Sequence, residues 1–228
     1  MIRVTENLRK IRDLLAETAV EAGRRPEDVH LLAVSKKQPI EKIVEAAAAG
    51  QRDFGENIVQ EGIDKVTKLA EKQLCWHFIG HLQSNKTRPV AEHFDWVHSV
   101  DKLKTAKRLS EQRPESLGDL NVCIQINIDE EASKSGVPPS EVADLARAVA
   151  GLPRLRLRGL MCLPAFREAF DDQRLPFALT RELAESLARD GIVMDTLSMG
   201  MSDDFRAAIM EGATIVRIGT AVFGPRDA

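Results

Sequence analysis

The stretch VHLLAVSKKQPIEKIVEAAAAG, residues 29–50, sets the pattern that decides the fold. A short apolar run over Val29–Ser35 is followed by a polar turn and by apolar residues at helical spacing over Ile40–Ala49. Pro39 stands where this helix begins, and Gly50 stands where it ends. The stretch therefore predicts one strand–loop–helix unit.

The same alternation continues along the rest of the chain. Because no hairpin turn joins consecutive strands, we expect a parallel sheet. The predicted strands are Val29–Ser35, Arg52–Gly55, Cys75–Ile79, Trp96–Val100, Val122–Ile128, Leu155–Met161, Met194–Ser198 and Thr214–Ile218. The predicted helices after them are Ile40–Ala49, Ile58–Glu71, Leu82–Glu92, Lys102–Glu111, Ser140–Ala150, Phe177–Arg189 and Asp203–Met210.

Eight strands favour a closed (β/α)8 barrel of the triosephosphate isomerase type, and 228 residues suit that fold. An open doubly wound sheet would ordinarily need a G-x-G-x-x-G loop after its first strand, and the sequence contains none. An amphipathic helix over residues 1–23 precedes the first strand and is expected to pack on the barrel. We expect residues 1–228 to form a single domain.

The composition excludes several classes of protein. A net charge of −3 and a pI near 6.0 argue against a general nucleic-acid binder. The three cysteines are widely spaced within apolar runs, which fits a reducing cytoplasm. We find no secretory signal and no apolar run long enough to cross a bilayer. The chain is expected to be a cytoplasmic protein without a membrane partner.

Lys36 ends the first strand and shares a face with Leu32 and Val34, because alternate residues of a strand point the same way. One interpretation is an ordinary lysine whose amine reaches solvent. The other is an amine whose pKa is lowered by an apolar site, so that it can form a Schiff base.

The last two strands end in Leu197–Ser202 and Arg217–Thr220, and each of these segments supplies glycine and hydroxyl groups. Loops at these positions form the usual phosphate site of such barrels. Ser202 and the two aspartates after it are equally typical of a helix start. Strand alternation also points Arg217 into the barrel, where its acceptor is either a carboxylate such as Glu56 or a ligand atom.

A first-strand lysine, an inward-pointing arginine and a phosphate site together suit pyridoxal 5'-phosphate (PLP). The sequence resembles the pyridoxal phosphate homeostasis proteins, which are related to the fold-type III barrel domain of alanine racemase. Only Lys37-Gln38 departs from the family pattern, which more often has Thr-Lys there. The resemblance covers Leu32 to Gly224 and rests on the segments AVSK (33–36), DFGEN (53–57), HFIGHLQSNK (77–86), SKSGV (133–137), RGLM (158–161), LSMGMS (197–202) and VRIGT (216–220).

The resemblance implies PLP as the cofactor, held by Lys36 as an internal aldimine. It places one group of residues around the phosphate, Arg217 at the pyridine nitrogen, two residues beside the ring and one in the barrel lining. The phosphate group is Ser198, Met199, Gly200, Gly219 and Thr220, the residues beside the ring are Asn57 and Met161, and the lining residue is His77.

The resemblance also implies a carrier that takes part in intracellular PLP homeostasis without substrate turnover. Its partners would be PLP and apoenzymes that accept PLP, and we expect a monomer. The alternative is an amino-acid racemase with Lys36 as a base. A racemase of this type needs a tyrosine and a second domain, whereas the sequence has no tyrosine and ends four residues after Gly224. Cys162 or His81 would have to replace that tyrosine. A Schiff-base aldolase is a third class, but its lysine is expected on a later strand.

Two other features have weaker signals. His77 and His81 share a strand face, but no cysteine or carboxylate completes a ligand set at the right spacing, so we predict no metal. Lys134 follows the fifth strand at the barrel mouth. One interpretation is that Lys134 contacts the cofactor phosphate or assists PLP transfer. The other is an ordinary solvated lysine.

Overall fold

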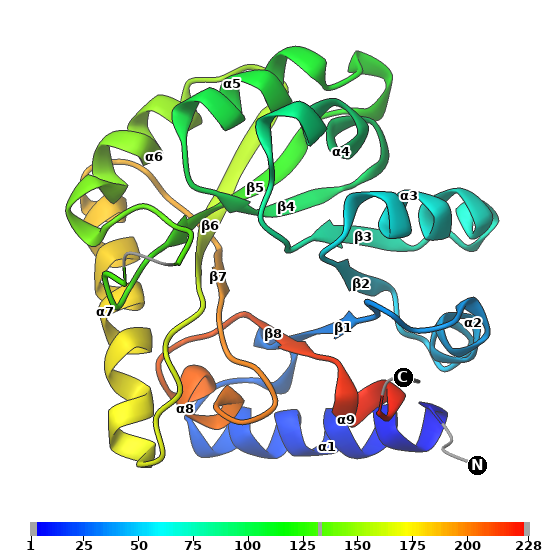
Figure 1. Ribbon diagram of the computed structural model, residues 1–228. Helices are drawn as coiled ribbons and strands as arrows, with labels where there is room; N and C mark the ends of the chain where they lie inside the picture. Colours follow the sequence, from blue (N-terminus) through cyan, green and yellow to red (C-terminus); the bar gives the residue numbers. More distant parts are fainter. Residues whose placement is uncertain (1–3, 132–133, 226–228) are drawn as a thin grey trace.

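A computed structural model describes residues 4–131 and 134–225, and within these ranges eight parallel strands close into one barrel (Figure 1). Each strand pairs with the next along the chain, and the last pairs with the first. The barrel prediction is therefore confirmed. The strands are β1 His30–Val34, β2 Asp53–Glu56, β3 Cys75–Phe78, β4 Trp96–Val100, β5 Leu120–Ile126, β6 Leu155–Cys162, β7 Thr196–Ser198 and β8 Ile215–Ile218.

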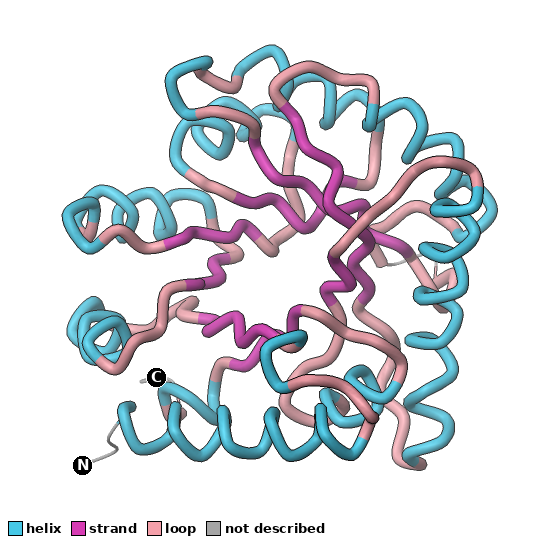
Figure 2. Tube along the Cα trace, turned by 180° about the vertical axis from the view of Figure 1, so that it is seen from behind, coloured by secondary structure: helices cyan, strands magenta, loops and turns pink. Residues whose placement is uncertain are grey.

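Helices form an outer layer around the barrel (Figure 2). None of those in the described residues is long and apolar enough to cross a membrane. The α-helices are α1 Val4–Glu21, α2 Ile40–Ala48, α3 Val59–Lys68, α4 Thr87–His93, α5 Leu103–Gln112, α6 Val142–Ala150, α7 Phe170–Arg189, α8 Phe205–Met210 and α9 Thr220–Phe223. Short 3-10 helices are η1 Pro26–Asp28, η2 Ala70–Lys72, η3 Ser84–Lys86, η4 Glu115–Leu117 and η5 Pro139–Glu141.

Helix boundaries are where the sequence prediction is least accurate. Helix α7 begins at Phe170, seven residues before the expected start at Phe177, and it contains the buried Pro176. Proline is usually confined to the first turn of a helix, so the sequence pattern conceals the turns that precede it. The helix expected over Leu82–Glu92 is divided into η3 and α4.

Strand alternation separates the barrel interior from the layer between strands and helices. On β8, Val216 and Ile218 belong to the main hydrophobic core, whereas Arg217 points inward. The predicted N-terminal helix is present as α1, which packs against α2, α8 and α9 through an apolar face that includes Leu8 and Leu15. Figure 1 shows α1 running alongside α8 and α9. This helix covers the side of the barrel where β8 meets β1.

Candidate functional site

Lys36 is a half-buried residue just beyond the carboxyl end of β1. The chain is fixed on both sides of it. The backbone N–H of Lys37 donates to Glu61 Oε1 at 2.5 Å, and the Lys65 ammonium donates to the Ser35 carbonyl at 2.7 Å. These bonds set the direction in which the Lys36 side chain leaves the backbone.

Glu56 and Lys65 form a buried ion pair beneath this turn. Lys65 Nζ lies 2.8 Å from Glu56 Oε1 and 2.6 Å from Glu61 Oε1, and the Ser35 hydroxyl donates to Glu56 at 2.6 Å. Burial raises the pKa of Glu56, although the hydrogen bonds from Lys65 and Ser35 oppose this shift. Glu56 is therefore part of the support for the Lys36 turn.

The buried Arg217 guanidinium lies inside the barrel, as strand alternation predicted. Its Nη1 donates to the carbonyl of Ser198 and, at 2.7 Å, to the Ser198 hydroxyl, and Nη2 donates to the Cys162 carbonyl at 2.8 Å. The sequence suggested Glu56 as one possible acceptor, but these neutral oxygens take its place. Burial lowers the pKa of Arg217, yet a guanidinium keeps its proton in proteins.

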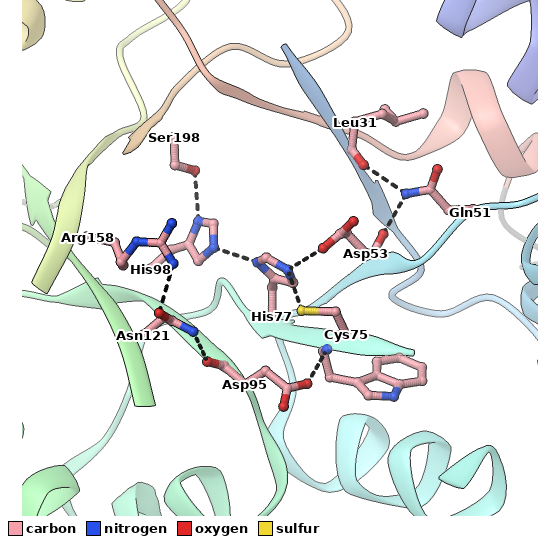
Figure 3. A network of polar contacts seen from close by, with 11 residues as sticks. Leu31, Gln51, Asp53, Cys75, His77, Asp95, His98, Asn121, Arg158 and Ser198 are labelled. Atoms are coloured by element: carbon pink, nitrogen blue, oxygen red, sulfur yellow. Dashed lines mark hydrogen bonds and ion pairs between the residues drawn. The ribbon is translucent and has the colours of Figure 1, made fainter. Parts of the chain in front are cut away.

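A line of hydrogen bonds runs from Arg217 through the barrel interior to the opposite end. Ser198 Oγ lies 2.8 Å from His98 Nδ1, and His98 Nε2 lies 2.9 Å from His77 Nδ1. His77 Nε2 then reaches Asp53 Oδ1 at 3.1 Å (Figure 3). Burial holds the pKa of His98 well below its usual range, so this histidine is neutral.

The two ends of this line limit how hydrogens can be placed along it. Arg217 can only donate, and an ionised Asp53 carboxylate can only accept. One hydrogen on each intermediate group satisfies the line when Ser198 donates to His98, His98 Nε2 donates to His77, and His77 Nε2 donates to Asp53. In this arrangement each histidine carries the hydrogen of the line on Nε2.

The loops after β7 and β8 lie together at the carboxyl end of the barrel. Gly200 has φ +93°, and a Cβ there would lie 2.6 Å from the Cβ of Ala208. A Cβ on Gly219 would lie 3.2 Å from the Val34 carbonyl oxygen, so the β8 loop closely approaches β1. Both loops thus contain backbone without side chains, and at Gly219 this backbone lies next to the end of β1. Such backbone is what a bound anion needs for close approach.

The predicted phosphate residues contribute in different ways. Met199 is buried in the core outside the barrel, so only its backbone belongs to the loop. Thr220 is exposed at the start of α9. Ser198 is buried, and its hydroxyl is already engaged by Arg217 and His98.

The three remaining predicted residues are Asn57, Met161 and His77, and they do not all lie at the carboxyl end of the barrel. Asn57 follows β2, and its buried Oδ1 has no hydrogen-bond partner within the described residues. Met161 lies inside the barrel with Trp96 and Cys123. The structure does not bring His77 to the carboxyl end. Its ring faces Asp53 near the amino end and is linked to Ser198 only through His98.

Lys134 lies at the rim of the carboxyl end, beside a cavity of about 350 Å³ that His81 and Asn127 also line. Its ammonium is 2.6 Å from Glu131 Oε1, and both side chains are about one-third exposed, at 35% and 39%. The structure thus places this amine at the rim in an ion pair.

Comparison with known proteins is consistent with this architecture. The family model for the alanine racemase N-terminal domain matches residues 3–227. A protein from Pseudomonas aeruginosa named pyridoxal phosphate homeostasis protein is 57% identical over 227 residues, which cover 100% of this chain and 97% of that protein. One of the same name from Escherichia coli K12 is 53% identical and covers 98% and 97% of the two chains. The chain belongs to the pyridoxal phosphate homeostasis protein family.

Solved structures agree with the family assignment. PipY of Synechococcus elongatus, determined with PLP bound, is 37% identical with a TM-score of 0.84, and the match covers 97% of this chain and 100% of that one. Alanine racemase from Corynebacterium glutamicum has a TM-score of 0.72 at 17% identity, covering 99% of this chain and 62% of the racemase. The racemase therefore shares the fold.

His98 was not identified from the sequence, although it links Ser198 to His77 inside the barrel. The signal was available, because Trp96 and His98 alternate on one strand as Cys75 and His77 alternate on its neighbour. The register places Trp96 beside His77 in the closed barrel. Stacking of the two rings at 5.2 Å confirms that Trp96 faces the interior.

Proposed function

We propose that this chain binds PLP at the carboxyl end of the barrel and supplies it to other proteins. The observation that supports this most directly is the combination of a lysine on a fixed turn, side-chain-free loop backbone beside it and a buried guanidinium within the barrel. The naming of close relatives as homeostasis proteins and the PLP-bound PipY structure support the same proposal.

The residues present fit this cofactor. Asn57 Oδ1 is a buried acceptor that lacks a protein partner in the described chain, so a ligand can engage it. Gly200 and Gly219 pack closely against Ala208 and the Val34 carbonyl, so the two loops present backbone without side chains at these positions. PLP supplies, when bound, an aldehyde that reacts with amines. We assign Lys36 as its covalent anchor.

We carry the other assignments over from the family resemblance. Ser198, Met199, Gly200, Gly219 and Thr220 surround the phosphate, with Met199 contributing backbone alone. Arg217 would hold the ring nitrogen, and its Nε–H is not used by its contacts with Ser198 and Cys162. Asn57 and Met161 lie beside the ring, and His77 acts at one remove through His98 and Ser198.

We further propose that the chain holds PLP without turning over an amino acid. A guanidinium does not readily give its proton to the ring nitrogen, which keeps that nitrogen a weak electron sink. The sequence also contains no tyrosine to act as the second base of a racemase. The thiol of Cys162 is buried, and burial raises its pKa to about 11, which makes it a poor substitute.

The visible absorption spectrum of the purified protein, reconstituted with PLP, tests the proposal. We expect a violet-absorbing band in the wild type that is absent from Lys36→Ala, with Lys37→Ala as the matched control that keeps it. Failure of the wild type to develop this band would overturn the assignment. Incubation with D- and L-alanine and a chiral assay then tests turnover, and transfer of PLP to an apoenzyme tests delivery.

A further inference from the structure

Three side chains of metal-binding type meet at the amino end of the barrel. Asp53 and Cys75 are register partners on β2 and β3, and His77 follows Cys75 by two residues on the same face. Their ligand atoms Oδ1, Sγ and Nε2 all lie within 4.8 Å of one another. The spacing of residues along the sequence does not reveal this set, because Asp53 lies on a different strand from Cys75 and His77. His81, which the sequence pairs with His77, is not part of the set.

The distances are close to those that a zinc ion requires. Zinc lies about 2.0–2.3 Å from S, N and O ligands, so two ligands at a tetrahedral angle lie about 3.3–3.7 Å apart. His77 Nε2 is 3.3 Å from Cys75 Sγ and 3.1 Å from Asp53 Oδ1. Both distances are at or slightly below this range, so the Asp53 and Cys75 side chains would move slightly away from His77 to admit the ion.

A cavity gives access to this set. It has a volume of about 660 Å³ and is lined by Asp53, His77 and Trp96 among others. The Asp53 side chain is 42% exposed, whereas His77 is only 3% exposed. Zinc can thus enter from solvent and keep one position for water or a small ligand, as three-ligand zinc sites do.

The surroundings favour a cation. Of the arginines that line the cavity, Arg158 is paired with Asp195 at 2.8 Å, and Arg24 donates to the backbone carbonyls of Ile209 and Ala213. Asp95 accepts a hydrogen bond from the Trp76 N–H and adds negative charge beside Cys75. The local positive charges are therefore engaged with other groups.

His98 supplies the outer partner that metal-bound histidines usually have. It lies 2.9 Å from His77 Nδ1, the nitrogen that faces away from the ligand set (Figure 3). With zinc on Nε2, His77 carries its proton on Nδ1 and donates it to His98 Nε2. His98 Nδ1–H then donates to Ser198 Oγ, so the ring orientation is kept.

We propose that Asp53, Cys75 and His77 bind one Zn²⁺ ion at the amino end of the barrel. The thiol proton of Cys75 passes to solvent as the sulfur–zinc bond forms, and the fourth ligand is water from the cavity. A thiolate and an imidazole select zinc over magnesium or calcium, which prefer oxygen ligands. The site uses no residue of the proposed PLP anchor or phosphate loops.

Zinc titration of the full chain after chelator treatment, with and without PLP, tests the proposal. Competition with a chromophoric chelator gives the affinity, and native mass spectrometry gives the stoichiometry. We expect one Zn²⁺ per chain. Loss of an outer hydrogen-bond partner can weaken metal binding by roughly 100-fold, and loss of the Cys75 ligand in Cys75→Ala should weaken zinc binding by more than that. Asp53→Asn should also weaken zinc binding. Cys162→Ala, which removes a buried thiol of the main core, should leave the affinity unchanged.

Cobalt gives an independent readout. Co²⁺ bound by a thiolate shows a charge-transfer absorption that should appear in cofactor-free wild type and Cys162→Ala, and be lost in Cys75→Ala. Thermal unfolding of each variant verifies that it is folded. The proposal is overturned if the wild type binds no stoichiometric zinc. It is also overturned if folded Cys75→Ala and Asp53→Asn bind zinc as the wild type does.

Discussion

Toward the carboxyl end of the barrel, the charged side chains of Lys65 and Arg217 are buried, and each is held by several hydrogen bonds. Lys65 bonds three oxygens, and Arg217 bonds Ser198 and the Cys162 carbonyl. At the amino end, Asp53 and Asp195 have side chains that are 42% and 57% exposed beside an open cavity. The buried groups toward the carboxyl end thus fix backbone and side-chain positions, whereas the amino end is open to solvent. Substitutions at the two ends should differ accordingly in cost.

Lys65→Met is the substitution that we expect to cost most. It leaves Glu56 buried without its counterion, and breaking a buried pair in this way costs about 3–5 kcal/mol in the free energy of unfolding. Because Lys65 also holds the Ser35 carbonyl, the Lys36 turn should loosen and PLP binding should weaken. Urea denaturation and PLP titration measure the two effects.

Two variants sharpen this test. Lys68→Met changes the same residue type on the exposed face of α3 and should alter stability by less than about 0.5 kcal/mol. Adding Glu56→Gln to Lys65→Met removes the unpaired charge and should recover part of the loss. If Lys65→Met were as stable as Lys68→Met, the carboxyl end would not depend on the buried pair.

Gly200→Ala comes next in expected size. A left-handed φ costs a residue with a Cβ about 1–2 kcal/mol, and forcing that Cβ against Ala208 adds about 1–3 kcal/mol. Gly191→Ala is the matched control, because Gly191 has φ +87° and open space around its Cβ position. Denaturation should show the larger loss for Gly200→Ala. Equal losses of stability in the two variants would mean that the loop after β7 can move away from Ala208 at no cost in free energy.

The sequence could predict the barrel because each strand–helix unit has its own local pattern, as residues 29–50 illustrate. It could also place Lys36, Gly200 and Gly219 at the carboxyl end, because that position follows from strand direction alone. Arg217 was correctly pointed inward by alternation. Its acceptors were not predictable, because Ser198 and Cys162 come from two other strands and two of the three oxygens are backbone carbonyls.

Contacts between different strands account for most of what the sequence did not reveal. The Asp53–Cys75 pair depends on the register of β2 against β3, which one strand's pattern does not determine. His98 reaches Ser198 across the barrel, a separation of 100 residues along the chain. The early start of α7 was hidden by Pro176, whose usual meaning in a sequence is a helix boundary.

Ser198→Ala and Asp53→Asn compare the two ends of the internal hydrogen-bond line. Ser198→Ala takes the hydroxyl from a buried Arg217 N–H donor and from the buried His98 Nδ1 acceptor, so we expect a loss of about 1–3 kcal/mol. Asp53→Asn, at the exposed end and with zinc removed by a chelator, should cost less than about 1 kcal/mol, because water can replace the contact. Denaturation of both variants in the same buffer gives the comparison. A larger loss for Asp53→Asn would reverse the assignment of the rigid and open ends.

Asp195→Asn should have the smallest effect, because the Arg158–Asp195 pair is partly exposed at the amino end. Burial alone would raise the pKa of Asp195, but hydrogen bonds from Arg158 and Thr196 outweigh it and the pKa is lowered. A carboxyl with a lowered pKa stabilises the fold above its unfolded-state pKa of about 4, and this contribution is lost as the pH falls through the folded-state value. The wild type should therefore exceed Asp195→Asn by about 0.2–1 kcal/mol near neutral pH, and the difference should shrink steadily on acidification below about pH 4. Urea denaturation of both proteins across this range measures it, and a difference that grew on acidification would contradict the ion pair as the cause.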